Sequence, residues 1–245
     1  MKVAALLTGR GNNTLPDKNI LPLFGAPLLS YPARAALAVE GIQRHFVSSD
    51  DEKILRIAQD LGYTPIKRPQ ELALPTSQHI DAIRHALEFM DSHFGFVPDV
   101  LVVLLANSAT IKSEWIAQAI AMIERDSSIS AVVPVQKDQD HHPYRAKRLN
   151  AQGSLEPFFE FGDMEISTNR QDLQSCYFLC HNFWVLNLTK SLYAKDGQKP
   201  WVFLGNNIKP IFTQGCFDVH TLEDLAKSEQ WLRENGGVPL SGGGG

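Results

Sequence analysis

The run Val100-Leu101-Val102-Val103-Leu104-Leu105 decides the fold class of this chain. An uninterrupted stretch of β-branched residues and leucines is typical of a strand that is buried on both faces of a parallel sheet. Other apolar runs of strand length occur at residues 2–7, 45–49 and 129–135. Amphipathic patterns with helical spacing separate these runs, at residues 27–39, 51–61, 77–90 and 113–125. The alternation predicts an α/β fold in which helices cover both faces of a mostly parallel central sheet.

The second half of the chain has a different residue composition. Polar and turn-forming residues dominate 141–174, and strand-like runs follow at 177–186 and 201–204. We interpret this region as an antiparallel excursion with an exposed apolar face. Either a second copy of the chain or the excursion's own core covers that face.

The chain then returns to the core through a strand-like run at 216–219. Thr221 and Asp224 have the spacing of a capping box at the start of a final helix, and Gly236-Gly237 is expected to end that helix. The predicted division is a core over 1–136, an excursion over 137–204, a return to the core over 205–237 and a flexible glycine-rich tail over 238–245.

Composition and charge exclude several classes of protein. The 245 residues are 44% hydrophobic and 20% charged, which suits a globular domain with a full core. A formal net charge of -4 lacks the basic excess of a nucleic-acid-binding surface, and no apolar run reaches membrane-spanning length. Three cysteines without zinc spacing, and a first stretch that does not look like a signal peptide, predict a reduced, cytoplasmic protein.

The first strand-like run leads into Leu7-Thr8-Gly9-Arg10-Gly11-Asn12-Asn13-Thr14-Leu15-Pro16-Asp17-Lys18-Asn19. Glycines directly after a strand let backbone N–H groups approach an anion, and Arg10 and Lys18 add positive charge at the same point. The stretch predicts a cradle for a triphosphate. A dinucleotide-binding turn is one alternative, but Thr14 stands where that motif needs glycine or alanine, and Pro16 would interrupt its helix. A charged surface turn is the other alternative.

Five motifs lie in order along the core. They are Leu15-Pro16-Asp17-Lys18-Asn19-Ile20 with Gly25-Ala26-Pro27-Leu28-Leu29, Val47-Ser48-Ser49-Asp50-Asp51-Glu52, Arg68-Pro69-Gln70-Glu71-Leu72-Ala73, His85-Ala86-Leu87, and Asp218-Val219-His220-Thr221-Leu222-Glu223-Asp224-Leu225. Together they resemble the acylneuraminate cytidylyltransferase family, which includes CMP-sialic acid synthetases and is related to CMP-Kdo synthetases. The resemblance implies a three-layer, Rossmann-like α/β nucleotidyltransferase fold whose small antiparallel excursion forms a homodimer.

The resemblance also implies roles for individual residues. Arg10, Lys18 and Asp218 become the candidate catalytic residues. Arg68 is expected to reach the cytosine or the ribose of CTP, and residues 76–79 to surround the base. The residues expected to bind the nucleotide are Thr8, Gly9, Arg10, Gly11, Asn12, Asn13, Lys18, Asn19, Arg68, Ser77 and His79.

The metal motif of the family is altered here. Asp218 aligns with the first acid of an Asp-x-Asp motif that holds a hard cation against triphosphate oxygens, and His220 occupies the second position. Because a neutral imidazole adds no negative charge, Mg²⁺ is expected to rest mainly on Asp218 and the triphosphate, with Mn²⁺ relatively favoured. The alternative is that Asp218 only caps the last helix.

The acceptor contacts of the family are also altered. Sialic acid enzymes end the central strand with Leu-Gln-Pro-Thr-Ser-Pro, where this chain has Leu105-Ala106-Asn107-Ser108-Ala109-Thr110. Phe178-Leu179-Cys180-His181-Asn182 replaces an Arg-Pro-Asn-Gly-Ala segment, so an arginine suited to grip a carboxylate is missing. We predict a different nonulosonic or related sugar acid, or an acceptor that carries a phosphonate or phosphate. Its expected neighbours are Asn107, Ser108, Tyr144, Arg145 and His181.

The sequence therefore predicts a CTP-dependent cytidylyltransferase that transfers CMP to a small anionic acceptor and releases pyrophosphate. A non-catalytic nucleotide-binding homologue is the alternative, because His220 and the acceptor loops depart from the family. His141 and His142 are either solvated loop residues, neighbours of the acceptor or, with Cys180, ligands of a zinc ion.

Overall fold

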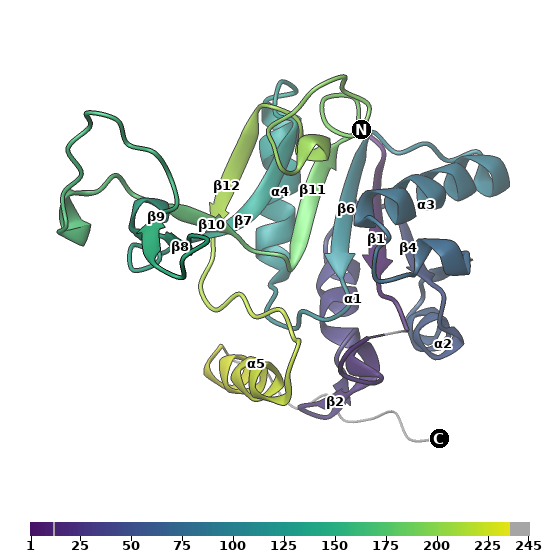
Figure 1. Ribbon diagram of the computed structural model, residues 1–245. Coiled ribbons are helices and arrows are strands. Elements are labelled where there is room, and N and C mark those ends of the chain that lie inside the picture. Colours follow the sequence, from purple (N-terminus) through teal and green to yellow (C-terminus); the bar gives the residue numbers. More distant parts are fainter. Residues whose placement is uncertain (12, 236–245) are drawn as a thin grey trace. The chain divides into compact units, whose positions relative to one another are not determined.

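A computed structural model describes residues 1–11 and 13–235 of the chain (Figure 1). The chain forms two compact units. The larger contains Met1–Pro134 and the described residues from Cys180 onward, and the smaller is Val135–Leu179. The expected helix end at Gly236-Gly237 and the expected tail over 238–245 lie outside the described residues, and the division of the chain into four parts stays a prediction.

Parallel strands form the centre of the larger unit. They are β1 (Val3–Thr8), β4 (Arg44–Ser49), β5 (Thr64–Lys67) and β6 (Val100–Leu105), in the spatial order β6-β1-β4-β5. The register pairs Thr8 with Leu105 on one side and with Ser48 on the other. The carboxyl ends of these strands therefore meet at one edge of the sheet. The bounds of β6 are those predicted, whereas β5 had no counterpart in the sequence analysis.

Antiparallel strands extend the sheet beyond β6. β11 (Phe183–Asn187) pairs with β6 on one side and with the start of β7 (Ala131–Lys137) on the other, and β12 (Ile208–Phe212) pairs with β7. The single strand expected over 177–186 is wrong. Its first part is β10 (Tyr177–Leu179), which pairs with the end of β7, and residues 180–182 interrupt the run before β11 begins, so two strands replace the one expected.

Two further strand predictions are wrong. Residues 201–204 contain the 3-10 helix η5 (Val202–Leu204), because the Leu204 N–H bonds back to the Trp201 carbonyl at 2.9 Å. Residues 216–219 form no ladder. The Phe217 N–H donates to Thr110 Oγ1 at 3.0 Å and the Val219 N–H to the Asn107 carbonyl at 3.0 Å, so this segment is held by the loop after β6.

The faces of the sheet are covered by α1 (Ser30–Leu37), α2 (Glu52–Asp60), α3 (His79–Phe94) and α4 (Ser113–Arg125). The helix α5 (Leu222–Glu234) instead packs in a separate apolar cluster that includes Leu28 and Ala109. α1, α2 and α4 share one apolar core with Val3, Ala5 and Leu7 of β1. α3 lies on the opposite face (Figure 1), where Ala4 and Leu6 are also fully buried. Burial on both faces is what the continuous apolar runs predicted.

The predicted capping box at the start of α5 is confirmed. Thr221 Oγ1 accepts from the Asp224 N–H at 3.2 Å, and Asp224 Oδ2 accepts from the Thr221 N–H at 2.9 Å. Thr221→Ala is expected to lower the free energy of unfolding by about 1 kcal/mol, because it leaves helix N–H groups without this acceptor. Urea denaturation measures the effect, with Thr168→Ala at an exposed position of the smaller unit as control. An unchanged midpoint for Thr221→Ala would contradict the capping role.

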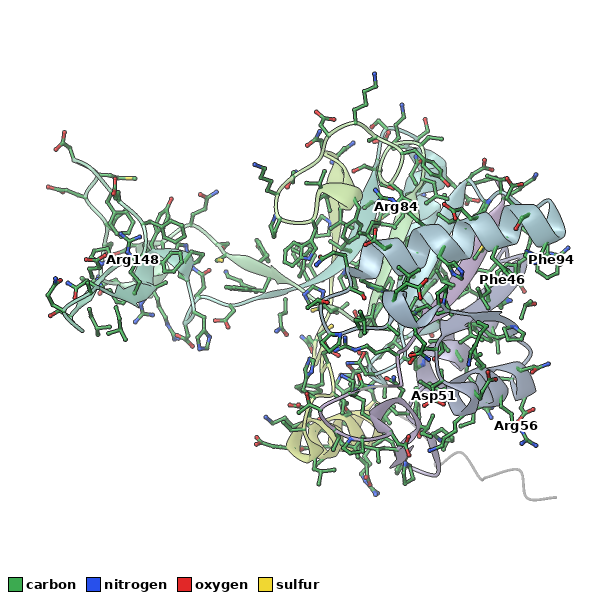
Figure 2. The ribbon with its side chains drawn as sticks, turned by 45° about the vertical axis from the view of Figure 1, so that its right-hand side comes forward. Phe46, Asp51, Arg56, Arg84, Phe94 and Arg148 are labelled. Atoms are coloured by element: carbon green, nitrogen blue, oxygen red, sulfur yellow. The ribbon has the colours of Figure 1, made fainter. Side chains whose placement is uncertain are left out.

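The smaller unit presents many apolar side chains to solvent. β8 (Lys147–Leu149) and β9 (Leu155–Pro157) form a hairpin, on which Figure 2 labels Arg148. Arg148 forms an ion pair with Glu156 across the hairpin, at 2.7 Å. Leu149 and Leu155 are 69% and 70% exposed. Other large apolar side chains of the unit are exposed as well, namely Tyr144, Phe158, Phe159, Met164, Tyr177 and Phe178. The described residues of this unit thus carry a large number of exposed apolar side chains.

Two further features concern the described helices and the cysteines. Across residues 1–11 and 13–235, no helix combines the length and apolar character needed to cross a membrane. Cys176, Cys180 and Cys216 are all free thiols.

Candidate active site

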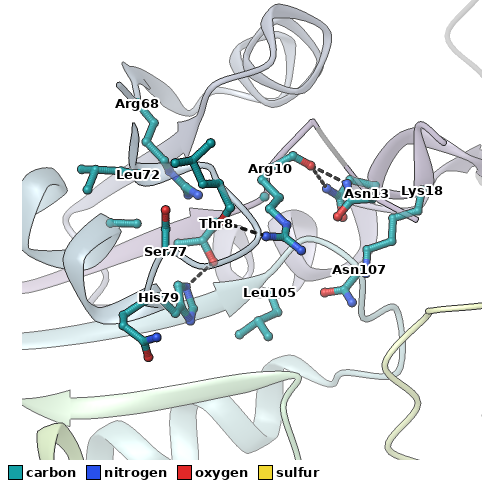
Figure 3. Close-up of a pocket in the computed structure, with 15 residues that line it drawn as sticks. Thr8, Arg10, Asn13, Lys18, Arg68, Leu72, Ser77, His79, Leu105 and Asn107 are labelled. Atoms are coloured by element: carbon teal, nitrogen blue, oxygen red, sulfur yellow. Dashed lines mark hydrogen bonds between the residues drawn. The ribbon is translucent and has the colours of Figure 1, made fainter. Parts of the chain in front are cut away.

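A pocket of about 220 Å³ opens where β1 and β6 end (Figure 3). Its walls come from the loop after β1, from the segment that leads into α3 and from the end of β6. The lining residues are Thr8, Gly9, Arg10, Asn13, Lys18, Asn19, Arg68, Leu72, Leu74, Ser77, Gln78, His79, Ala82, Leu105 and Asn107. The structure thus brings together the residues predicted to bind the nucleotide, except Gly11, which is not in the lining, and Asn12, which lies outside the described residues.

Close approach of neighbouring atoms explains both glycines in the loop after β1. A Cβ on Gly9 would lie 2.9 Å from the Ala106 Cβ, and one on Gly11 would lie 2.7 Å from a carboxylate oxygen of Asp51. The Gly11 N–H also donates to Asp50 Oδ1 at 2.9 Å. The loop is therefore pinned against the ends of the neighbouring strands before any ligand binds.

Two asparagine side chains brace this loop from within. Nδ2 of Asn13 and Nδ2 of Asn19 donate to the Arg10 carbonyl oxygen, at 2.6 and 2.9 Å. Each side-chain amide thus spends an N–H donor on a hydrogen bond within the protein. Their predicted contact with a triphosphate stays a prediction.

Arg10 and Lys18 supply positive charge to the pocket. Arg10 Nη1 donates to the Leu74 carbonyl at 3.1 Å, which ties the loop to the segment before α3. Lys18 is half-buried, and burial lowers its pKa although the nearby Asp218 carboxylate acts in the opposite sense. An ammonium group that has lost part of its water shell interacts more strongly with an anionic ligand than an exposed one does.

Arg68 is a buried cation in the same pocket. It is 5% exposed, and it donates from Nε to Ser48 Oγ at 3.2 Å and from Nη2 to the Ser48 carbonyl at 2.8 Å. Burial lowers the pKa of Arg68 to about 10, so the guanidinium remains charged at neutral pH. Hydrogen bonds within the described part of the chain use two of its five N–H groups, and the others can reach a ligand.

His79 begins α3 at the wall of the pocket. Its Nε2 lies 2.9 Å from Thr8 Oγ1. Burial lowers the pKa of His79 to about 4, and the nearby Arg68 guanidinium acts in the same direction. The imidazole is therefore neutral at pH 7.

Acidification is expected to destabilise the protein through His79. In the unfolded chain a histidine titrates near 6.5, so between that pH and about 4 the unfolded state holds one more proton than the folded state. The free energy of unfolding then falls as the pH is lowered from 7 to 4, by up to about 3 kcal/mol from this group. Urea denaturation at both pH values should show a smaller loss for His79→Asn than for the wild type. Equal losses would show that His79 is not held neutral.

Asp218 is linked to the pocket through Asn107. Nδ2 of Asn107 donates to Asp218 Oδ1, and His220 Nε2 lies 3.0 Å from Asp218 Oδ2. Ser108 Oγ donates to the Phe217 carbonyl at 3.0 Å. Asn107 and Ser108, predicted to contact an acceptor, thus also hold the segment that carries the predicted metal ligand.

The groups around Asp218 fit a hard cation that is bound chiefly by a ligand's phosphates. Mg²⁺ is typically held in proteins through one or two carboxylates together with phosphate oxygens, and Asp218 supplies one carboxylate. Within residues 1–11 and 13–235, no three or more His, Cys, Asp and Glu side chains form a metal-binding cluster, which leaves the zinc alternative unsupported. Metal binding by Asp218 and His220 stays a prediction.

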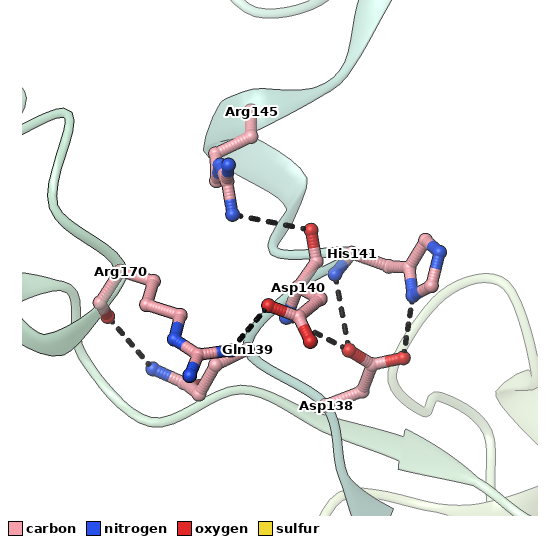
Figure 4. Close-up of polar contacts among 6 residues, drawn as sticks. All are labelled: Asp138, Gln139, Asp140, His141, Arg145 and Arg170. Carbon is pink, nitrogen blue, oxygen red and sulfur yellow. Dashed lines mark hydrogen bonds and ion pairs between the residues drawn. The ribbon is translucent and has the colours of Figure 1, made fainter.

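The other residues predicted to contact the acceptor substrate belong to both compact units. In the larger unit, His181 lies between Trp184 and Trp201, with ring centroids 5.9 and 5.6 Å away, and burial lowers its pKa. In the smaller unit, Tyr144 and Arg145 belong to the 3-10 helix η3 (Pro143–Arg145). Figure 4 shows Arg145 donating to the Asp140 carbonyl, at 3.4 Å. Their contact with an acceptor stays a prediction.

A profile of the family described as cytidylyltransferase matches residues 8–156. The chain belongs to the cytidylyltransferase family. The matched span includes the loop after β1, Arg68, His79 and Asn107, and the segment with Asp218 lies beyond it.

Named cytidylyltransferases resemble the chain to different extents. CMP-N,N'-diacetyllegionaminic acid synthase of Legionella pneumophila is 28% identical over 244 residues, which cover 96% of this chain and 98% of that protein. N-acylneuraminate cytidylyltransferase of Escherichia coli is 30% identical over 135 residues, or 55% of this chain. The match covers 31% of the Escherichia coli protein and 35% of N-acylneuraminate cytidylyltransferase A of Danio rerio, so the chain spans about a third of these relatives.

Solved structures of cytidylyltransferases share the fold. CMP:2-keto-3-deoxy-manno-octonic acid synthetase complexed with CTP superposes with a TM-score of 0.67 at 15% identity, covering 96% of this chain and all (100%) of that chain. 4-Diphosphocytidyl-2C-methyl-D-erythritol synthase of Anaerococcus prevotii gives 0.62 at 12% identity, covering 95% and 96%. These similarities confirm the predicted α/β nucleotidyltransferase fold.

The sequence analysis missed several residues of this cytidylyltransferase pocket. Leu72 and Leu74 line it, and Asp50, just after the end of β4, accepts a hydrogen bond from the Gly11 N–H. The signal for Asp50 is its position, because ligands of such sheets lie at the carboxyl ends of the strands. The apolar lining residues carry no comparable signal.

Proposed function

We propose that this chain transfers CMP from CTP to a small anionic sugar acid and releases pyrophosphate. One observation carries the proposal, namely a single pocket in which a pinned glycine loop with two cations faces a buried guanidinium. Figure 3 shows Arg68 and His79 on one side of the pocket, and Lys18 and Asn107 on the other. A nucleotide can then lie with its base near Arg68 and its phosphates near Lys18.

The chemistry that we propose is in-line substitution at the α-phosphorus of CTP. An acceptor oxygen forms a bond to this phosphorus as the bond to the bridging oxygen of the β-phosphate breaks, and pyrophosphate leaves with that electron pair. Arg10 and Lys18 stabilise the charge that builds up on the phosphate oxygens, and the pinned loop holds the phosphates in line. Mg²⁺, held through Asp218, would add charge neutralisation on the triphosphate when bound. An acceptor that is already an anion needs no general base.

The proposed acceptor is a nonulosonic or related sugar acid. The similarity to a legionaminic acid synthase over almost the whole chain supports this class. The residues at 178–182 lack an arginine that could hold a carboxylate in two parallel hydrogen bonds, which favours an acceptor other than ordinary sialic acid. The alternative acceptor carries a phosphonate or a phosphate.

Pyrophosphate release tests the function. We expect release from CTP and Mg²⁺ with at least one sugar acid of a panel that contains nonulosonic acids, phosphonates and sugar phosphates. UTP and ATP should be poor substrates, and EDTA should stop the reaction. Binding of CTP without pyrophosphate release across the panel would instead identify a non-catalytic nucleotide-binding protein.

The proposal includes a cytoplasmic homodimer. The exposed apolar side chains of Val135–Leu179, Leu149 and Leu155 among them, support a second copy as their cover. The free cysteines support a reducing, cytoplasmic location. Light scattering after size exclusion should give twice the 27.3 kDa chain mass, and a monomer at micromolar concentration would contradict the dimer.

A further inference from the structure

The hydrogen bonds of Thr8 fix the tautomer of His79. Thr8 Oγ1 lies 3.2 Å from the Leu104 carbonyl oxygen and 2.9 Å from His79 Nε2. The hydroxyl has one hydrogen, and the carbonyl oxygen can only accept. Thr8 therefore donates to Leu104 and accepts from His79. The proton of the neutral imidazole then sits on Nε2, and Nδ1 carries a lone pair.

This lone pair is available to a ligand. Hydrogen bonds among residues 1–11 and 13–235 leave His79 Nδ1 without a partner, and it is not one of the polar atoms that are sealed from solvent. His79 lines the pocket at the start of α3. Because burial and the Arg68 guanidinium oppose a positive charge on His79, Nδ1 does not gain a proton at pH 7. It can accept a hydrogen bond and cannot donate one.

Arg68 provides the opposite type of group in the same pocket. Two of its N–H groups are used on Ser48, and its other donors remain for a ligand. The pocket therefore offers one acceptor and several donors. The pairing edge of cytosine has a matching pattern, since its 4-amino group donates while N3 and O2 accept. Uracil has O4 as an acceptor and N3–H as a donor, the reverse pattern at these two positions.

We infer that His79 is the residue that makes the pocket select cytosine over uracil. Nδ1 accepts a hydrogen bond from the 4-amino group of CTP, and Arg68 donates to N3 or O2. With UTP, O4 meets the lone pair of Nδ1 and no proton lies between them, so a buried polar pair is left unsatisfied. The inference rests on the proposed function and names the residue behind its nucleotide specificity.

Two substitutions test the inference in the full chain. His79→Asn replaces the fixed acceptor by an amide that can turn either its oxygen or its nitrogen toward the base. Thr8→Val keeps the imidazole but removes the hydroxyl that fixes its proton on Nε2. For both variants we expect the ratio of kcat/KM for CTP to kcat/KM for UTP to fall by roughly 10- to 100-fold, the range of one base-specific pair of hydrogen bonds. His93→Asn, near the exposed far end of α3, is the matched control and should keep the wild-type ratio.

The outcomes separate this inference from the proposed function. A wild type that uses neither CTP nor UTP overturns the function itself. A wild type that prefers CTP, together with an unchanged ratio in either variant, overturns the role of His79 and leaves the function standing. Circular dichroism confirms that each variant is folded, and calorimetric titration with CTP and UTP gives the same ratio from binding when turnover is slow.

Discussion

Lys18→Ala is expected to lower kcat/KM for CMP transfer by about 10²- to 10³-fold, or roughly 2.7–4 kcal/mol, by analogy with other preorganised groups that stabilise a developing charge. Lys18 lines the pocket beside the glycine loop, and it is half-buried, so water replaces its charge poorly when the side chain is removed. The loop is held by hydrogen bonds from Gly11 to Asp50 and from Asn13 and Asn19 to the Arg10 carbonyl, so its shape should survive the substitution. The loss should therefore appear mainly in kcat.

Lys227→Ala is the matched control for Lys18→Ala. Lys227 lies on α5, where it forms an exposed ion pair with Glu223 at 2.7 Å. Its removal takes away the same charge without touching the pocket, and the activity should stay at the wild-type level. Turnover that survives Lys18→Ala unchanged would remove Lys18 from the proposed mechanism.

Asp218→Asn is expected to reduce activity by about 100-fold or more, because a metal ion that neutralises a triphosphate contributes several kcal/mol. Asn keeps the size of the side chain, and its amide can still bond to Asn107 and His220. The change therefore removes charge more than structure. The Mg²⁺ concentration at half-maximal activity should rise, and excess metal should restore part of the rate. If the variant keeps the wild-type rate and the wild-type dependence on Mg²⁺, Asp218 does not bind the metal and its role is structural.

His220→Asp is the complementary change at the same place. It creates the second carboxylate that the Asp-x-Asp motif contains, two residues after Asp218. We expect the Mg²⁺ requirement to fall, because a hard cation prefers carboxylate oxygen to imidazole nitrogen. Gln59→Glu, at an exposed position of α2, adds the same charge away from the pocket and controls for a general effect of surface charge.

The fold could be predicted where local patterns and tertiary contacts agree. β6 and α4 have the predicted bounds, because their apolar residues point into the core in every turn or pleat. β5 was missed because it is short, contains Pro65 and lies at the edge of the sheet, where proline is tolerated. Residues 216–219 have the apolar pattern of a strand, but contacts with Thr110 and Asn107 hold them instead, and no local pattern encodes such contacts.

In the candidate site, too, some features could be predicted from the sequence and others could not. The glycine loop, Arg68 and His79 could be brought together from strand order and from the resemblance, because parallel strands end at one edge. The direction of each hydrogen bond could not be predicted from the sequence. That Asn13 turns its amide inward, or that Thr8 sets the proton of His79, depends on a few tenths of an ångström in side chains far apart in the sequence.

The position of β11 constrains how a newly made chain can fold. β11 lies between β6 and β7, but it is synthesised after both of them and after the whole of Val135–Leu179. Until residue 187 has left the ribosome, β6 and β7 each present an unpaired edge to other chains. The late arrival of one five-residue strand makes closure of the sheet a long-range step, so slow folding and chaperone dependence should depend on this strand more than on the parallel core.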